Sequence, residues 1–163
     1  MQPTVILTAL LWLSLYVLSK AGFIGMALLI QGRMPRLIEQ AEERYLRRPG
    51  RLVIVLGLIN GTTIPFISIL LIGTEVLALP GLVLLLFYLW LALLSYTVVY
   101  RATASRVLEL DDSNSHAKQT LFGGLAAEAA FCTPLLGQAY SILLFIRGLG
   151  AITAVLLSRM VKD

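Results

Sequence analysis

A long apolar stretch from Leu121 to Ser158 is the feature that most restricts how this chain can fold. At about 1.5 Å of rise per residue, one straight helix of this length would be nearly twice the roughly 30 Å thickness of a bilayer core. Pro134 interrupts the stretch, because proline removes a backbone donor and disfavours helical geometry at the preceding residue. Gly137 can adopt the left-handed conformation of a tight turn. Residues 121–158 are therefore predicted to form a helical hairpin that turns back within the membrane.

The composition agrees with a membrane protein. The 163 residues are 58% hydrophobic and 13% charged, whereas soluble domains have roughly 45–50% apolar and about 25% charged residues. Three more apolar runs, 3–30, 52–72 and 82–100, are each long enough to cross a bilayer as a helix. We predict a single all-α integral membrane domain, residues 1–163, with three transmembrane helices followed by the hairpin. The first run lacks the basic region and cleavage site of a signal peptide, so we expect it to stay as an anchor.

The connection 33–51 is rich in arginine and has a helical apolar face. That face consists of Met34, Leu37, Ile38, Ala41 and Tyr45. The pattern predicts an amphipathic helix on the membrane surface, with a solvated basic connector as the alternative. The arginines expected to bind lipid headgroups are Arg44, Arg47, Arg48 and Arg51, each contributing about 1 kcal/mol near an anionic surface. Nucleic acid is not an expected partner, because the chain offers no large folded basic face.

The positions of the basic residues predict the topology. Basic residues gather in the connections 33–51 and 101–118 and in the C-terminal tail, and none lies in 1–19 or 73–81. The positive-inside rule then places the N-terminus outside and both connections in the cytoplasm, as in a bacterial-type cytoplasmic membrane. If the basic tail is cytoplasmic too, the segment 121–158 must enter and leave on one side, which agrees with the predicted turn.

Small residues indicate close helix packing. Gly57 and Gly61 form a Gly-x-x-x-Gly pair, which lets another helix approach closely. Gly123, Gly124 and Ala127 belong to a second run of small residues at the start of the hairpin. These faces are predicted to pack against partner membrane helices or against copies of the same chain.

Glu128 and Arg147 are charged residues within the hairpin's apolar arms. They lie at similar distances from the turn, and an unpaired charge in lipid costs several kcal/mol, so we expect them to pair with each other. Lys20 is a possible competitor for Glu128. The alternatives are a functional ion or proton site, and an Arg147 side chain that reaches up to the interface.

The sequence does not favour enzymatic chemistry. The single histidine, His116, has acidic neighbours only in a flexible stretch, so no metal site and no cofactor is expected. No phosphate-binding glycine loop and no nucleophile with a neighbouring base is present. The expected function is a structural or accessory subunit that packs against partner membrane helices. The alternative is a small channel or transporter that uses the Glu128 and Arg147 pair.

Overall fold

The computed structural model describes residues 3–47, 50–107 and 115–160, and this part of the chain is helical with no strand. Its elements, in chain order, are α1 (Pro3–Arg33), α2 (Pro35–Leu46), α3 (Arg51–Ile72), the short 3-10 helix η1 (Glu75–Leu77), α4 (Ala78–Val107), α5 (His116–Phe131) and α6 (Leu136–Met160). The predicted all-α class is therefore confirmed.

Four segments of the described chain are long and apolar enough to cross a membrane. They are Leu10–Arg33 in α1, Arg51–Ile72 in α3, Glu75–Val107 across η1 and α4, and Leu136–Met160 in α6. The first three correspond to the predicted spans, and the fourth is the second arm of the predicted hairpin. Their length and apolar character support an integral membrane protein.

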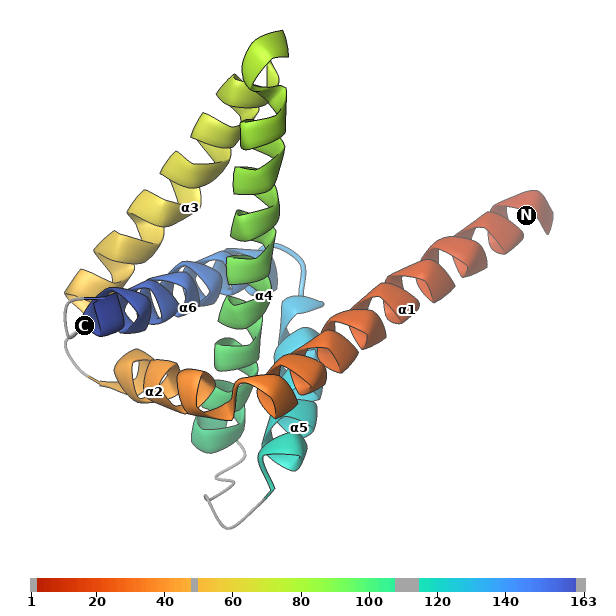
Figure 1. Ribbon diagram of the computed structural model, residues 1–163. Coiled ribbons are helices and arrows are strands. Elements are labelled where there is room, and N and C mark those ends of the chain that lie inside the picture. The colour runs from red at the N-terminus through yellow and green to blue at the C-terminus, as the bar shows by residue number, and fades with distance from the viewer. Residues whose placement is uncertain (1–2, 48–49, 108–114, 161–163) are drawn as a thin grey trace.

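Helix α4 is the centre of the arrangement, because α1, α2, α3, α5 and α6 all pack against it. In Figure 1, α3 and α4 form an antiparallel pair joined through η1, and α6 crosses this pair away from the η1 end. The first half of α1 points away from the other helices. Leu94, Val98, Ile38 and Ile152 are completely buried and belong to one core shared by α4, α2 and α6.

Small residues bring the crossing helices into backbone contact. A Cβ atom on Gly57 would collide with the carbonyl oxygen of Ile146, and one on Gly150 would collide with that of Val53. Helices α3 and α6 therefore touch directly through their backbones at this point. In the same way, a Cβ atom on Gly148 would meet Ser95 of α4.

Four of the five predicted helix-packing residues make contacts within this chain, which corrects the expectation that these four face partner helices. A Cβ atom on Gly123 would collide with the carbonyl oxygen of Tyr100, and one on Gly124 would press against the Tyr100 ring. Ala127 is buried beside them on α5. Gly57 packs on α6, and of the five only Gly61 faces open space.

The break between α5 and α6 lies where Pro134 predicts it, but the turn has a different conformation. Leu135 has a positive φ of 64°, and no glycine of the described residues does, so the left-handed conformation expected for Gly137 is wrong. Gly137 lies in the first turn of α6, where a Cβ atom would collide with the carbonyl oxygen of Ala130. After the turn the arms separate, because α5 packs mainly on α4 and α1 whereas α6 packs mainly on α3, α4 and α2.

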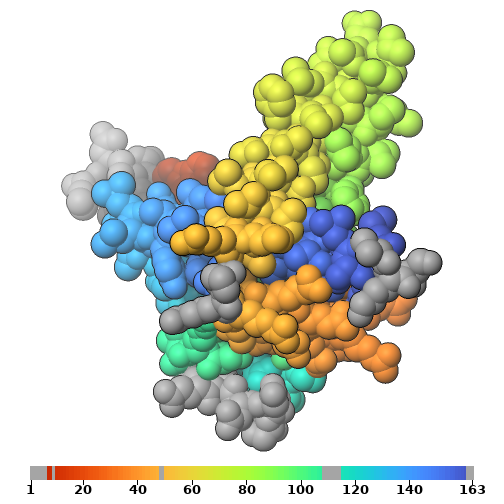
Figure 2. Space-filling model, turned by 90° about the vertical axis from the view of Figure 1, so that its left-hand side faces the viewer, coloured from red at the N-terminus to blue at the C-terminus, as the bar shows by residue number. Residues whose placement is uncertain are grey.

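Helix α2 turns its apolar face towards the protein, where a face lying on lipid was predicted. Leu37, Ile38, Ala41 and Tyr45 are buried, and α2 packs on α4 and α6. Figure 2 shows α2 lying beside α6 and below the start of α3. The neighbouring helices supply the apolar surface that a bilayer was expected to supply.

Candidate functional site

A buried polar contact joins three helices through Glu128 of α5. Its Oε2 atom lies 2.7 Å from the Lys20 Nζ atom of α1, and its Oε1 atom accepts a 2.5 Å hydrogen bond from the Tyr100 hydroxyl of α4. Only 8% of the Glu128 side chain is exposed, against 30% of the Lys20 side chain. The carboxylate therefore has both a counter-charge and a hydrogen-bond donor within the helix bundle.

The glycines on α5 explain why these three groups meet. Gly124 lies about one helical turn before Glu128, and a Cβ atom there would meet Ile24 of α1 as well as the Tyr100 ring. Ile24 in turn lies about one turn after Lys20. Because α5 carries no side chain at this point, α1 and α4 both come within reach of its carboxylate.

The contact between α1 and the end of α5 continues towards the hairpin turn. The Lys20 ammonium lies 5.5 Å from the centroid of the Tyr16 ring, which is a cation–π distance. The Tyr16 hydroxyl is 3.6 Å from the sulfur of Cys132, the residue after α5. These contacts hold the middle of α1 against α5.

Arg147 lies elsewhere, so the predicted pairing of Glu128 with Arg147 is wrong. Its Nη2 atom donates a 2.6 Å hydrogen bond to the carbonyl oxygen of Tyr45, and its guanidinium lies 4.8 Å from the centroid of the Tyr45 ring. The reason is the separation of the hairpin arms, which carries Arg147 to α2 while Glu128 stays between α1 and α4. Glu128 instead forms its ion pair with Lys20, the alternative partner.

A second buried ion pair, which the sequence analysis missed, joins α2 to α4. The Arg101 Nε atom lies 2.8 Å from the Glu42 Oε2 atom, and the Ser105 hydroxyl donates a 2.7 Å hydrogen bond to Glu42 Oε1. The Arg101 side chain is only 2% exposed. One signal was available, since Glu42 follows Ile38 by four residues and so shares its buried helical face.

The arginines predicted to bind headgroups separate into different environments. Arg44 donates a 2.9 Å hydrogen bond to the carbonyl oxygen of Ala154 on α6, so its guanidinium contacts the protein and joins α2 to α6. Arg47 and Arg51 are exposed, and their role in headgroup binding stays a prediction. Arg48 lies outside the described residues.

Two neighbouring residues of α2 contact the two ends of the segment that contains α5 and α6. The His116 Nε2 atom at the start of α5 lies 3.2 Å from Glu39 Oε1, and the Arg159 Nη2 atom near the end of α6 donates a 2.7 Å hydrogen bond to Gln40 Oε1.

Among the described residues, no group of three histidine, cysteine or acidic side chains is placed to hold a metal ion.

At this site an ammonium group and a phenol hydroxyl neutralise and hydrogen-bond one buried carboxylate. Lys20, Glu128 and Tyr100 can hold α1, α4 and α5 together. We compared the chain with family models, with curated proteins and with solved structures, and found no match in any of the three.

Proposed function

We propose that this chain is an accessory subunit that assembles with another membrane protein through the first half of α1. The supporting observation is that every described side chain from Leu7 to Ser19 is exposed, including Trp12 at 68%. Figure 1 shows this half of α1 projecting away from the other helices. We call residues 7–15 the α1 arm; Tyr16, which follows them, contacts Cys132 at the end of α5.

The anchoring of α1 supports binding to a partner helix. The Lys20 and Glu128 ion pair holds the arm at its base, so the arm's direction is set before any partner arrives. An arm that is already ordered loses less conformational entropy on binding. In lipid, helix association depends on van der Waals packing, and the arm has apolar side chains around its circumference for this purpose.

Site-specific photo-cross-linking in intact membranes tests this proposal. A photoreactive amino acid in place of Leu11 on the arm should give one discrete protein adduct, and a tagged copy of the identified protein should recover this chain. The matched control is Leu89 on α4, which is 50% exposed and should give only lipid adducts. Lipid adducts alone at both positions, or an adduct of this chain with itself, would contradict an accessory subunit.

The second candidate is a small channel or transporter, and it now rests on Glu128 with Lys20 and Tyr100 because Arg147 is elsewhere. A proton-exchanging carboxylate inside a helix bundle is typical of ion pathways. Proton flux into vesicles containing the purified chain, abolished by Glu128→Gln, would favour this candidate. A folded wild-type chain without flux would remove it.

For the topology we propose three membrane crossings and a re-entrant hairpin, with the N-terminus outside and the C-terminus cytoplasmic. If α6 were a fourth crossing, Arg159 would lie across the membrane from α2. The contacts of Glu39 with His116 and of Gln40 with Arg159 instead favour one side for both ends of the segment.

Cysteine labelling with a membrane-impermeant maleimide tests this topology in a Cys132→Ser background. Arg36→Cys, His116→Cys and Arg159→Cys should label from the cytoplasmic face only. Val76→Cys in η1, the control for the opposite face, should label from outside. Labelling of Arg159→Cys together with Val76→Cys would require four crossings.

A further inference from the structure

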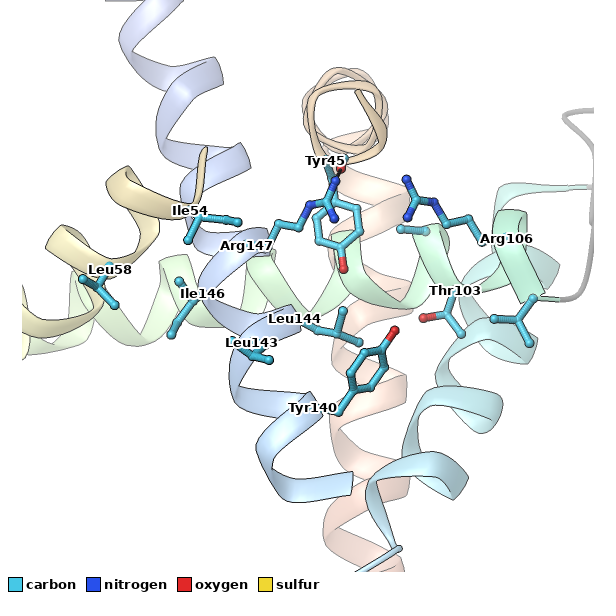
Figure 3. A pocket seen from close by; sticks show the side chains of 12 residues that line it. Tyr45, Ile54, Leu58, Thr103, Arg106, Tyr140, Leu143, Leu144, Ile146 and Arg147 are labelled. Atoms are coloured by element: carbon cyan, nitrogen blue, oxygen red, sulfur yellow. Dashed lines mark hydrogen bonds between the residues drawn. The ribbon is translucent and has the colours of Figure 1, made fainter. Parts of the chain in front are cut away.

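A cavity of about 350 Å³ lies between α3, α4 and α6 beside the end of α2. Arg147 and Arg106 line it on either side of Tyr45, and Figure 3 shows the hydroxyl groups of Tyr45 and Tyr140 directed into the same space. The rest of the lining is largely aliphatic and includes Leu143. The cavity thus has a cationic end and an apolar wall.

The two arginines are held in place by the last carbonyl groups of α2. Arg147 donates to the Tyr45 carbonyl oxygen, and Arg106 Nη2 donates to that of Leu46 at 3.1 Å. Helix ends leave these carbonyl groups without intrahelical partners, so the arginines cap α2. Each guanidinium has five N–H donors, so most of them remain for a ligand. The Nε atom of Arg147 is buried and has no hydrogen-bond partner among the described residues.

Capping leaves most of the positive charge unbalanced. A helix C-terminus carries roughly half a negative charge, against the two full positive charges of Arg106 and Arg147. No carboxylate is among the side chains described as lining the cavity, and neither arginine forms an ion pair with a described acidic residue. The cationic end therefore favours an anionic ligand, for which a phosphate group has suitable bidentate geometry.

The apolar wall selects the class of anion. Leu58 and Leu143 line the cavity and are each more than half exposed, so the wall continues to the outside of the protein. They lie on α3 and α6, two helices that are apolar enough to cross a membrane. A soluble phosphate ester would leave this wall unused, whereas an acyl chain can lie along it and continue into the bilayer.

We propose that this cavity binds an anionic phospholipid, with its phosphate between Arg106 and Arg147 and the start of one acyl chain against Leu58 and Leu143. The cavity volume is at the small end of the range of ligand sites, so it accommodates a headgroup and the first part of a chain. The bound lipid joins the end of α2 to α3 and α6.

Lipid binding to the purified full chain in dodecyl maltoside tests the proposal. Native mass spectrometry should show dioleoylphosphatidylglycerol bound at least tenfold more tightly than dioleoylphosphatidylcholine. Arg106→Gln should weaken phosphatidylglycerol binding about five- to tenfold, since it removes one charge at the headgroup. It should weaken phosphatidylcholine binding less, because the choline group of that lipid already offsets the charge of its phosphate. Arg106 is exposed, and water can replace its hydrogen bond to the Leu46 carbonyl oxygen, so the variant should remain folded with at most a small drop in unfolding temperature.

Two further variants test whether the effect is specific to this cavity and whether the apolar wall takes part in binding. Arg33→Gln removes an exposed arginine that does not line this cavity, and it should bind phosphatidylglycerol like the wild type. Leu143→Trp fills the apolar wall while both arginines stay, so it should weaken lipid binding. Equal effects of Arg106→Gln and Arg33→Gln would overturn the proposal. Competition by glycerol 3-phosphate at the affinity of the lipid, with no effect of Leu143→Trp, would overturn it in favour of a soluble phosphate ester.

Discussion

Gly57 of α3 and Gly150 of α6 pack against each other, so that the backbones of two long apolar helices are in direct contact. A Cβ atom on Gly150 would lie 2.9 Å from the Gly57 nitrogen, and one on Gly57 would lie 3.0 Å from the Gly150 nitrogen. The contact is reciprocal, so neither helix can accept a side chain here unless the other moves. It joins the start of α3 to the second half of α6.

Replacing Gly57 by alanine should therefore destabilise the fold. Overpacking costs about 1–3 kcal/mol in ordinary cores, and here the obstacle is backbone, which cannot rotate away. Gly61→Ala is the matched control, because nothing lies within 4 Å of its added Cβ atom and alanine favours the helix. Thermal unfolding in detergent should show a lower midpoint for Gly57→Ala only. Equal midpoints for both variants would contradict this contact.

The helices themselves follow from patterns that the sequence contains. The long helices could be predicted because each one is an apolar run long enough to cross a membrane. The break before α6 could be predicted because Pro134 disfavours a continuous helix. The partners of Gly57 and Gly123 could not, because a small residue allows close approach without specifying which helix approaches. The identity of the partner depends on how all the helices pack together.

The same reasoning explains which parts of the candidate site were predictable. Glu128 was recognisable as a buried acid because it lies among apolar and small residues. The residue that pairs with Glu128 depends on the direction of each helix after the turn. The prediction assumed that the two arms of the hairpin pack against each other, and this assumption wrongly paired Glu128 with Arg147. The amphipathic pattern of α2 correctly predicts a helix, but the same pattern suits a lipid surface and a protein surface equally.

The ion pair of Lys20 and Glu128 should show energetic coupling. Lys20→Met leaves a buried carboxylate with only the Tyr100 hydroxyl, so it should be more destabilising than Lys20→Met combined with Glu128→Gln. A double-mutant cycle by thermal unfolding should give a coupling of about 1 kcal/mol or more.

Arg147 provides the control cycle for this coupling. Because Arg147 contacts Tyr45 and Glu128 contacts Lys20, Arg147→Met and Glu128→Gln should have additive effects on stability. Strong coupling between Glu128 and Arg147, with none between Glu128 and Lys20, would restore the pairing expected from the sequence.

Tyr45 should make the stability of the fold sensitive to alkaline pH. Burial raises the pKa of its phenol from 10.0 to about 12, although the Arg147 guanidinium lowers it. The unfolded chain releases this proton near pH 10, so the contribution to stability is complete below that pH and is lost as pH rises towards 12.

Thermal unfolding midpoints at pH 8 and pH 11 test whether stability falls as the pH rises. The wild type should lose more stability over this interval than Tyr45→Phe, which has no proton to release. Tyr140→Phe removes an exposed tyrosine from the same cavity and serves as the control. An equal loss in the wild type and in Tyr45→Phe would contradict the raised pKa.

The buried pair of Glu42 and Arg101 should be the most sensitive polar contact between α2 and α4. Glu42→Gln leaves the Arg101 guanidinium almost completely buried without a counter-charge, and breaking a buried pair in this way costs roughly 3–5 kcal/mol. Glu43→Gln changes the neighbouring, exposed acid and should be nearly neutral. Glu42→Gln combined with Arg101→Met leaves no ion to desolvate, so part of the lost stability should return. If Glu42→Gln unfolds at the same temperature as Glu43→Gln, Arg101 must be neutralised by another group, and α2 is not held to α4 by this pair.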